Sequence, residues 1–210
     1  MLTIRKFTMM LVAVLFLSLS PAHAALLGVD LLLPDILSDQ TGFYTYSWDG
    51  NANEGLFTAR AVPLTITYDG ATMTNIGDVR GYDVAFYVDG TGNFLRGIGG
   101  ADLVIIGDGN LLLTGEVTGF GWQDVPNTKL ALFDFTFDVT GGDLAAFYTA
   151  GLGGDIALSE NSSFDGNWMV NHGGNKTKHD TAPVVPVPGA VWLLGGGLVG
   201  LVGLRRRKIS

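Results

Sequence analysis

The residues best suited to bind an ion lie in the segment Asp49-Gly50-Asn51-Ala52-Asn53-Glu54. Oxygen-bearing side chains at Asp49, Asn51 and Asn53 have the spacing of the first ligands in an EF-hand calcium loop. The pattern ends there, because Glu54 stands where that loop needs glycine and Arg60 stands where it needs glutamate. We therefore expect an Asx-rich hairpin turn and no cofactor. The alternative is a different calcium-stapled turn, with Asp49, Asn51, Asn53 and Glu54 as ligands.

Histidine is the usual base of a hydrolytic triad, and it is scarce in this chain. Beyond segment 1–24 it occurs only at His172 and His179, within the Gly- and Pro-rich stretch 171–184. We expect both histidines to be solvated there. The sequence contains neither a G-x-S-x-G nor an H-E-x-x-H motif. These observations indicate a protein that is not an enzyme.

Paired carboxylates could still hydrolyse glycosidic bonds, because such pairs come together only in the fold. Asp134 and Asp138 share the polar face of one expected strand, four residues apart and so about 13 Å apart by strand rise. That separation is wider than either glycosidase geometry, so we expect a solvated strand face. An exported carboxylate hydrolase remains the third functional hypothesis.

The tryptophans Trp48, Trp122 and Trp168 could form a platform on which sugar rings stack. Large aromatic side chains more often belong to the hydrophobic core. Core positions are therefore the expectation, and a sugar platform is the alternative.

Apolar residues alternate with polar ones along much of the chain, which is the pattern of half-buried strands. The clearest case is 133–139, where Phe133, Phe135 and Phe137 alternate with Asp134, Thr136 and Asp138. Asp-Gly and Gly-Gly turn signals separate the segments, and a short helix is expected at 143–150. The pattern predicts an all-β, antiparallel sandwich of the jelly-roll or Ig-like kind. The expected strands are 43–48, 64–68, 84–88, 103–106, 111–122, 133–139, 156–158 and 168–170.

Segment 1–24 has the layout of a secretory signal peptide. Arg5 and Lys6 form a basic start, an apolar run follows, and Ala22 and Ala24 form an A-x-A cleavage site. The exported domain is then expected over 25–170, with a linker at 171–184. Segment 25–180 holds six basic and twenty acidic residues, a net charge of −14 (6 − 20). Such a surface repels nucleic acid, so no nucleic-acid partner is expected.

Segment 185–210 forms a signal-like unit at the C-terminus. A box of Val185, Pro186, Val187, Pro188, Gly189 and Ala190 leads into an apolar stretch, and four basic residues close it. A single transmembrane helix is expected at 189–204. The cluster Arg205, Arg206, Arg207 and Lys208 is expected to stop transfer and to stay on the cytoplasmic side.

This ordered tail resembles the PEP-CTERM sorting signal of Gram-negative bacteria, with Val187 standing where the type motif has Glu. The resemblance implies processing near the box by exosortase, an integral-membrane cysteine protease. It also implies a transient precursor anchored in the inner membrane. The protein would then pass to the cell surface or extracellular matrix, in association with exopolysaccharide or biofilm. A plain C-terminal anchor is the alternative.

Three functional hypotheses follow from these observations. The first is a non-enzymatic surface or matrix protein that is exported, briefly anchored and released. The second is a calcium- or carbohydrate-binding sandwich module held at the membrane, and the third is the carboxylate hydrolase.

Overall fold

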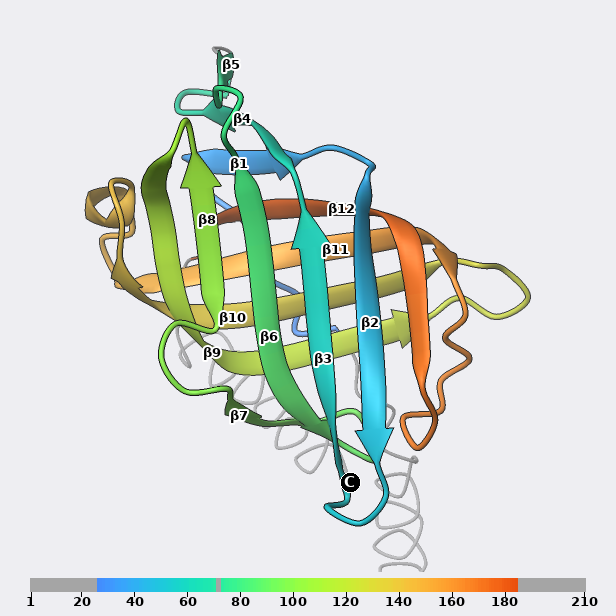
Figure 1. The fold of residues 1–210 in the computed structure, drawn as a ribbon. Coiled ribbons are helices and arrows are strands. Elements are labelled where there is room, and N and C mark those ends of the chain that lie inside the picture. Colours follow the sequence, from blue (N-terminus) through green and yellow to red (C-terminus); the bar gives the residue numbers. More distant parts are fainter. Residues whose placement is uncertain (1–25, 71–72, 185–210) are drawn as a thin grey trace, which may run out of the picture.

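The computed structural model describes residues 26–70 and 73–184, and most of the chain there is β-strand (Figure 1). One short 3-10 helix, η1 (Ala145–Phe147), lies between two long strands. The strands are β1 (Asp35–Ser38), β2 (Gly42–Asp49), β3 (Glu54–Ala61), β4 (Pro63–Thr67), β5 (Met73–Asn75), β6 (Gly81–Asp89), β7 (Phe94–Gly97), β8 (Leu103–Gly107), β9 (Asn110–Asp124), β10 (Ala131–Gly141), β11 (Leu152–Ser162) and β12 (His172–Pro183).

Eight of these strands form a closed antiparallel barrel, in the order β11-β10-β9-β8-β6-β3-β2-β12. The ring closes because β12 pairs with β2 on one side and with β11 on the other. Strands β1, β4 and β5 extend from β12 as an arm, and β7 pairs with β6 outside the ring. All of these pairings are antiparallel.

The predicted sandwich is therefore wrong, because two long strands, β9 and β12, join the two layers into a closed barrel. In Figure 1, β2, β3, β6 and β8 run steeply in front, while β9, β10 and β11 cross behind them. Two crossing layers can be joined by long strands that bend from one into the other. Strand β9 pairs with β8 over residues 110–115 and with β10 over residues 114–124. Strand β12 does the same between β2 and β11, with a register shift between Asn175 and Thr177.

The second correction concerns the expected linker 171–184, which is the closing strand β12. Buried and exposed residues do alternate along β12, but the side chains that face the barrel interior are polar. Thr177, His179 and Thr181 are each at most 1% exposed, whereas Lys178 between them is exposed. Because period-two patterns are recognised by apolar residues, this strand resembled a loop in the sequence.

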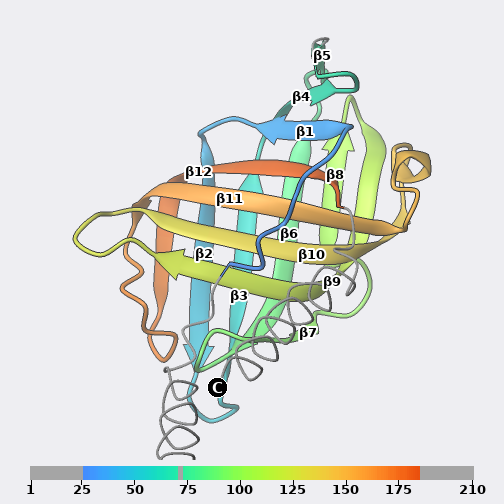
Figure 2. The ribbon, with the colours of Figure 1, turned by 180° about the vertical axis from the view of Figure 1, so that it is seen from behind.

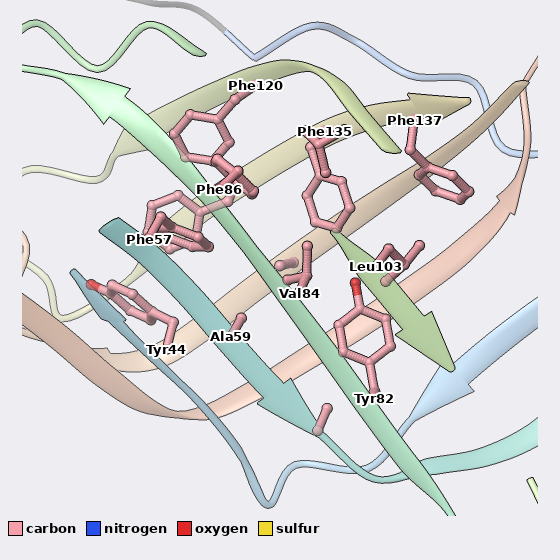
Figure 3. Packing of buried hydrophobic residues seen from close by; sticks show 14 of the residues in the cluster. Tyr44, Phe57, Ala59, Tyr82, Val84, Phe86, Leu103, Phe120, Phe135 and Phe137 are labelled. Atoms are coloured by element: carbon pink, nitrogen blue, oxygen red, sulfur yellow. The ribbon is translucent and has the colours of Figure 1, made fainter. Parts of the chain in front are cut away.

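The barrel interior is filled by aromatic and aliphatic side chains (Figure 3). Phe57 packs against Phe86 and Phe133, with ring centroids 5.1 and 5.2 Å away. Glycines on neighbouring strands leave the room that these rings need. A Cβ at Gly115 or at Gly153 would overlap the ring of Phe137, which lies between them. The fold therefore depends on pairing large residues on one strand with small ones on the next.

The segment before β1 runs over the outer face of the barrel (Figure 2). The backbone N–H groups of Leu27 and Gly28 donate to the carboxylate of Asp134, each at 2.9 Å. Asp134 is only 2% exposed as a result. The expectation of a solvated face is therefore wrong for Asp134, although Asp138 is exposed as expected.

Other expectations differ in part from the structure. The expected helix at 143–150 contains only η1, and the expected strand at 168–170 is a loop. Over 26–70 and 73–184, the structure contains no helix of the length and apolarity needed to cross a membrane. The expected signal peptide with Ala22 and Ala24, and the expected transmembrane helix 189–204, lie outside the described residues.

Candidate functional site

The most polar part of the barrel interior is centred on Asp155 of β11, which is fully buried. Its Oδ2 accepts hydrogen bonds from the Tyr82 hydroxyl at 2.9 Å and from the Thr181 hydroxyl at 2.6 Å. Its Oδ1 lies 2.9 Å from Nδ1 of His179, and a carboxylate can only accept, so Nδ1–H donates. Burial and the neighbouring Asp155 raise the pKa of Tyr82 well above its usual value.

An aspartate that orients a histidine is part of many catalytic sites, but here the group is enclosed. Tyr82, Asp155, His179 and Thr181 are each at most 2% exposed. Within the described residues, Nε2 of His179 and the hydroxyl of Tyr148 are buried without a hydrogen-bond partner. Since a substrate needs access to the base, this arrangement supports a structural role. It fastens β11 and β12 to β6 where the barrel closes.

The second histidine, His172, lies in a cage of aromatic rings. It stacks on Tyr46 at 4.7 Å between centroids and contacts Phe164 and Trp168 at 4.6 and 5.0 Å. Neither ring nitrogen has a hydrogen-bond partner in the described part of the chain. Burial lowers the pKa of His172 to about 4, although the charge of Asp165 acts in the opposite direction. Both histidines are therefore buried, and the expectation that they are solvated is wrong.

Two carboxyl groups lie together on the outer side of the β1–β12 pair. The Asp180 side chain interacts with that of Asp35, and Oδ1 of each is buried with no hydrogen-bond partner among the described residues. Burial, followed by the interaction with Asp35, raises the pKa of Asp180 to about 8. Asp180 therefore holds a proton at neutral pH.

The candidate calcium loop forms the tight turn between β2 and β3. Oδ1 of Asp49 accepts the backbone N–H groups of Asn51 at 2.9 Å and Ala52 at 3.4 Å. Asn53 has a positive φ of 54°, and Glu54 pairs with Arg96 at 2.6 Å. In residues 26–70 and 73–184, no three His, Asp or Glu side chains gather in a metal-binding arrangement. Calcium binding by this loop stays the untested alternative to a simple turn.

The tryptophans divide between core and rim. Trp168 and Trp122 are 1% and 6% exposed and pack at 5.6 Å, so they are core residues as expected. Trp48 is partly buried against the core. The buried rings of Trp122 and Trp168 present no open face on which a sugar could stack.

Two neighbouring clefts mark the outer wall, on either side of the loop 97–101. The first, the Arg96 cleft, measures about 350 Å³ and is lined by residues that include Phe94, Arg96 and Glu116. The second, the Arg60 cleft, measures about 340 Å³ and is lined by residues that include Arg60, Asp83 and Ile98.

Asp102 lines both clefts and holds the loop between them in place. It is 4% exposed, and its carboxylate accepts the N–H groups of Ile98 at 2.8 Å and Val117 at 2.9 Å. The clefts are therefore a fixed feature of the wall. No motif in the sequence pointed to them.

Sequence reasoning also missed the Asp155 group. Asp155 stands in the run Gly153-Gly154-Asp155-Ile156, which matches no motif, and its partner Tyr82 is 73 residues away. The one usable signal was the alternation of Thr177, His179 and Thr181. The predicted sorting motif Val185–Ala190 and the basic cluster Arg205–Lys208 lie outside the described residues. Comparisons with protein-family models, with curated proteins and with solved structures found no match.

Proposed function

We propose that this chain is an exported, non-enzymatic protein of the cell surface or extracellular matrix. Its barrel is delivered by a C-terminal signal that exosortase processes, and the released protein associates with exopolysaccharide or biofilm. One observation carries the proposal: the folded domain extends to Val184, which forms a bridge with Leu31. The box begins at the next residue, so a cut within it would release the whole barrel.

The burial of the reactive side chains supports the non-enzymatic part of the proposal. The chain's Asp–His–Tyr group is enclosed in the core, and His172 is enclosed by aromatic rings. Asp134, one of the two carboxylates considered for glycoside hydrolysis, is engaged by the backbone of Leu27 and Gly28. None of these three groups is open to a substrate that binds at the surface.

The absence of a linker between barrel and box makes the proposal more specific. Strand β12 ends at Pro183, two residues before Val185, so the protease would act close to the barrel wall. Pro186 and Pro188 lack N–H groups and disfavour helix in the residues before them. These prolines would keep the box extended, which is the backbone form that proteases bind.

The test is the intact mass of the protein recovered from the medium of cells that express the full chain. Wild type should lack both segment 1–24 and the tail. Replacing Pro186 and Pro188 with Ala should leave full-length protein in the inner membrane. Neutral residues at Arg205, Arg206 and Arg207 should weaken retention, so that uncut protein reaches the medium.

Pro126→Ala, in an exposed loop of the barrel, is the matched control and should be released normally. Release of the double proline variant with the wild-type mass would contradict recognition of the box. The tail would then be a plain anchor or a signal of another kind.

A binding module is the second candidate function. The pair of clefts on the outer wall favours it, because each combines charged and apolar side chains at an accessible surface.

A further inference from the structure

We propose that the Arg60 and Arg96 clefts together bind a neutral polysaccharide. The inference deepens the matrix role proposed above and rests on it. The clefts lie side by side on the outer wall and share Asp102, with the loop 97–101 as a ridge between them. Each is lined by one arginine that pairs with a carboxylate: Arg60 with Asp83, which lines the same cleft, and Arg96 with Glu54, which lies outside the lining. That repetition suits a ligand built of repeating units.

The chemistry of the Arg60 cleft matches a ring with adjacent hydroxyl groups. Nε of Arg60 lies 2.7 Å from Oδ1 of Asp83, and both side chains are more than half exposed. A guanidinium offers five N–H donors and a carboxylate offers acceptor oxygens, while each sugar hydroxyl can donate and accept. An arginine and an aspartate side by side can therefore bind two neighbouring hydroxyls at once.

Apolar surface next to this ion pair suits the C–H face of a sugar ring. Ala85, Val104 and Ile98 line the Arg60 cleft, and Ile98 is 47% exposed. Apolar contact of this kind removes area from water and favours binding. The cleft therefore pairs a polar edge with an apolar floor.

Arg96, which lines the second cleft, is a more rigid arginine, and the residues that hold its guanidinium, Glu54 and Tyr87, lie outside the cleft lining. Nη2 of Arg96 lies 2.6 Å from Oε1 of Glu54, and its guanidinium carbon lies 3.7 Å above the centre of the Tyr87 ring. Stacking on an aromatic ring fixes the plane of a guanidinium and reduces the entropy lost on binding. Glu116 lines the same cleft as a further acceptor.

Charge favours a neutral polymer over an anionic one. Segment 25–180 carries six basic and twenty acidic residues, so a polyanion would be repelled over most of the barrel surface. Both arginines of the clefts are already paired with carboxylates. A neutral polysaccharide meets no such repulsion.

The strand pairing in the Arg60 cleft argues against a peptide ligand. Peptides commonly add to a sheet through an unpaired edge. Strands β3, β6 and β8, which line this cleft, are each paired on both sides. A ligand there can contact side chains, but it cannot extend the sheet.

The test uses the full, unprocessed chain in mild detergent, so it does not depend on sorting. Native electrophoresis is run in gels that contain dextran, galactomannan, alginate or a tryptic digest of casein. We expect retardation by at least one of the two neutral polysaccharides. Arg60→Met and Arg96→Met should each weaken Kd about tenfold, through loss of charge-assisted hydrogen bonds.

Lys178→Met is the matched control, because it removes an exposed cation on β12, away from both clefts. It should bind as wild type, and all three variants should keep the wild-type melting temperature. The proposal is overturned if neither neutral polysaccharide retards the chain or if only alginate or casein peptides do. It is also overturned if Lys178→Met weakens binding as much as the arginine variants. Any of these results leaves the sorting proposal intact, because release is measured separately.

Discussion

Strands β10 and β12 occupy equivalent places in the barrel wall, yet they fill its interior in opposite ways. Strand β10 turns Phe133, Phe135 and Phe137 inward, whereas β12 turns Thr177, His179 and Thr181 inward. All six side chains are at most 1% exposed. Position in a closed barrel therefore decides burial, and side-chain chemistry decides only how the buried group is stabilised.

The two strands differ in the kind of interaction that holds them. The rings of β10 gain from packing, which has little directionality and depends on complementary volumes. Two of the polar groups of β12, on His179 and Thr181, donate to one carboxylate, Asp155, whereas the Thr177 hydroxyl is buried without a hydrogen-bond partner among the described residues. A buried polar group without such a partner would be strongly destabilising. Strand β12 is thus held by few, specific contacts and β10 by many general ones.

The largest predicted effect comes from emptying the β10 side of the core. Phe135→Ala removes a ring that is 1% exposed and packs against Phe86 at 5.9 Å. The lost contact and the cavity should lower the free energy of unfolding by about 3–5 kcal/mol in urea titrations. Leu132→Ala, on the outer side of β10, is the control. Equal losses in the two variants would contradict this account of the core.

The next effect concerns His172, the first residue of β12, whose contribution to stability depends on pH. His172 has a folded pKa of about 4, below its unfolded value of about 6.5. The unfolded chain therefore binds the proton more readily between these values, and stability falls as pH drops from about 6.5 to about 4. The loss should reach about 3 kcal/mol.

His172→Phe keeps an aromatic ring in the cage and removes the proton uptake. The difference between wild-type and variant stability, measured by urea unfolding at a series of pH values, isolates the contribution of His172. A difference that does not change between pH 7 and pH 4 would show that His172 is not buried in its neutral form.

A smaller effect is expected from the carboxylate that holds β12. Asp155→Asn keeps one acceptor oxygen but points an amide N–H₂ at donors, leaving at least one of Tyr82, His179 and Thr181 unsatisfied. The free energy of unfolding should fall by about 1–3 kcal/mol. Asp138→Asn on the exposed face of β10 should change it by less than about 0.5 kcal/mol. If Asp155→Asn leaves the free energy of unfolding unchanged, packing alone holds β12 in the barrel.

The smallest effect concerns the outer side of β12. The pKa of Asp180 is raised to about 8, so the folded chain holds a proton that the unfolded chain releases near pH 4. Stability from this group is full at low pH and is lost as pH rises towards 8. Asp180→Asn should make stability less dependent on pH and raise the melting temperature at pH 8 by about 2–4 °C. Thermal melts at pH 5 and pH 8 test this, with a larger gain expected at pH 8.

The same comparison explains what the sequence could predict. The alternation Phe-Asp-Phe-Thr-Phe identified β10, and similar patterns identified β2, β4 and β6. For β12 the inward residues are Thr, His and Thr, and the outward ones include Lys178 and Asp180. Since both faces are polar, local periodicity carried no hydrophobic signal there.

Closure and the candidate sites were out of reach for a related reason. Antiparallel pairing of β10 with β11 places Gly153 opposite Phe137, whose ring needs the space that the glycine leaves, and no local pattern contains this match. The Asp155 group joins β6, β11 and β12. The clefts depend on one buried carboxylate, Asp102, that fixes a glycine-rich loop. In each case the deciding contact is between residues that the sequence gives no reason to associate.

The strand that closes the barrel is also the last strand of the described residues, and this sets an order on folding. Until His172–Pro183 has been made and delivered, β11 and β2 each keep an open edge. Open edges and an uncovered aromatic interior invite pairing between chains. A ribosome or a translocation channel works from the N-terminus to the C-terminus, so the barrel stays open until its final strand arrives. A chain that stops before residue 172 would therefore aggregate, and complete passage of the polypeptide is a condition for the native state.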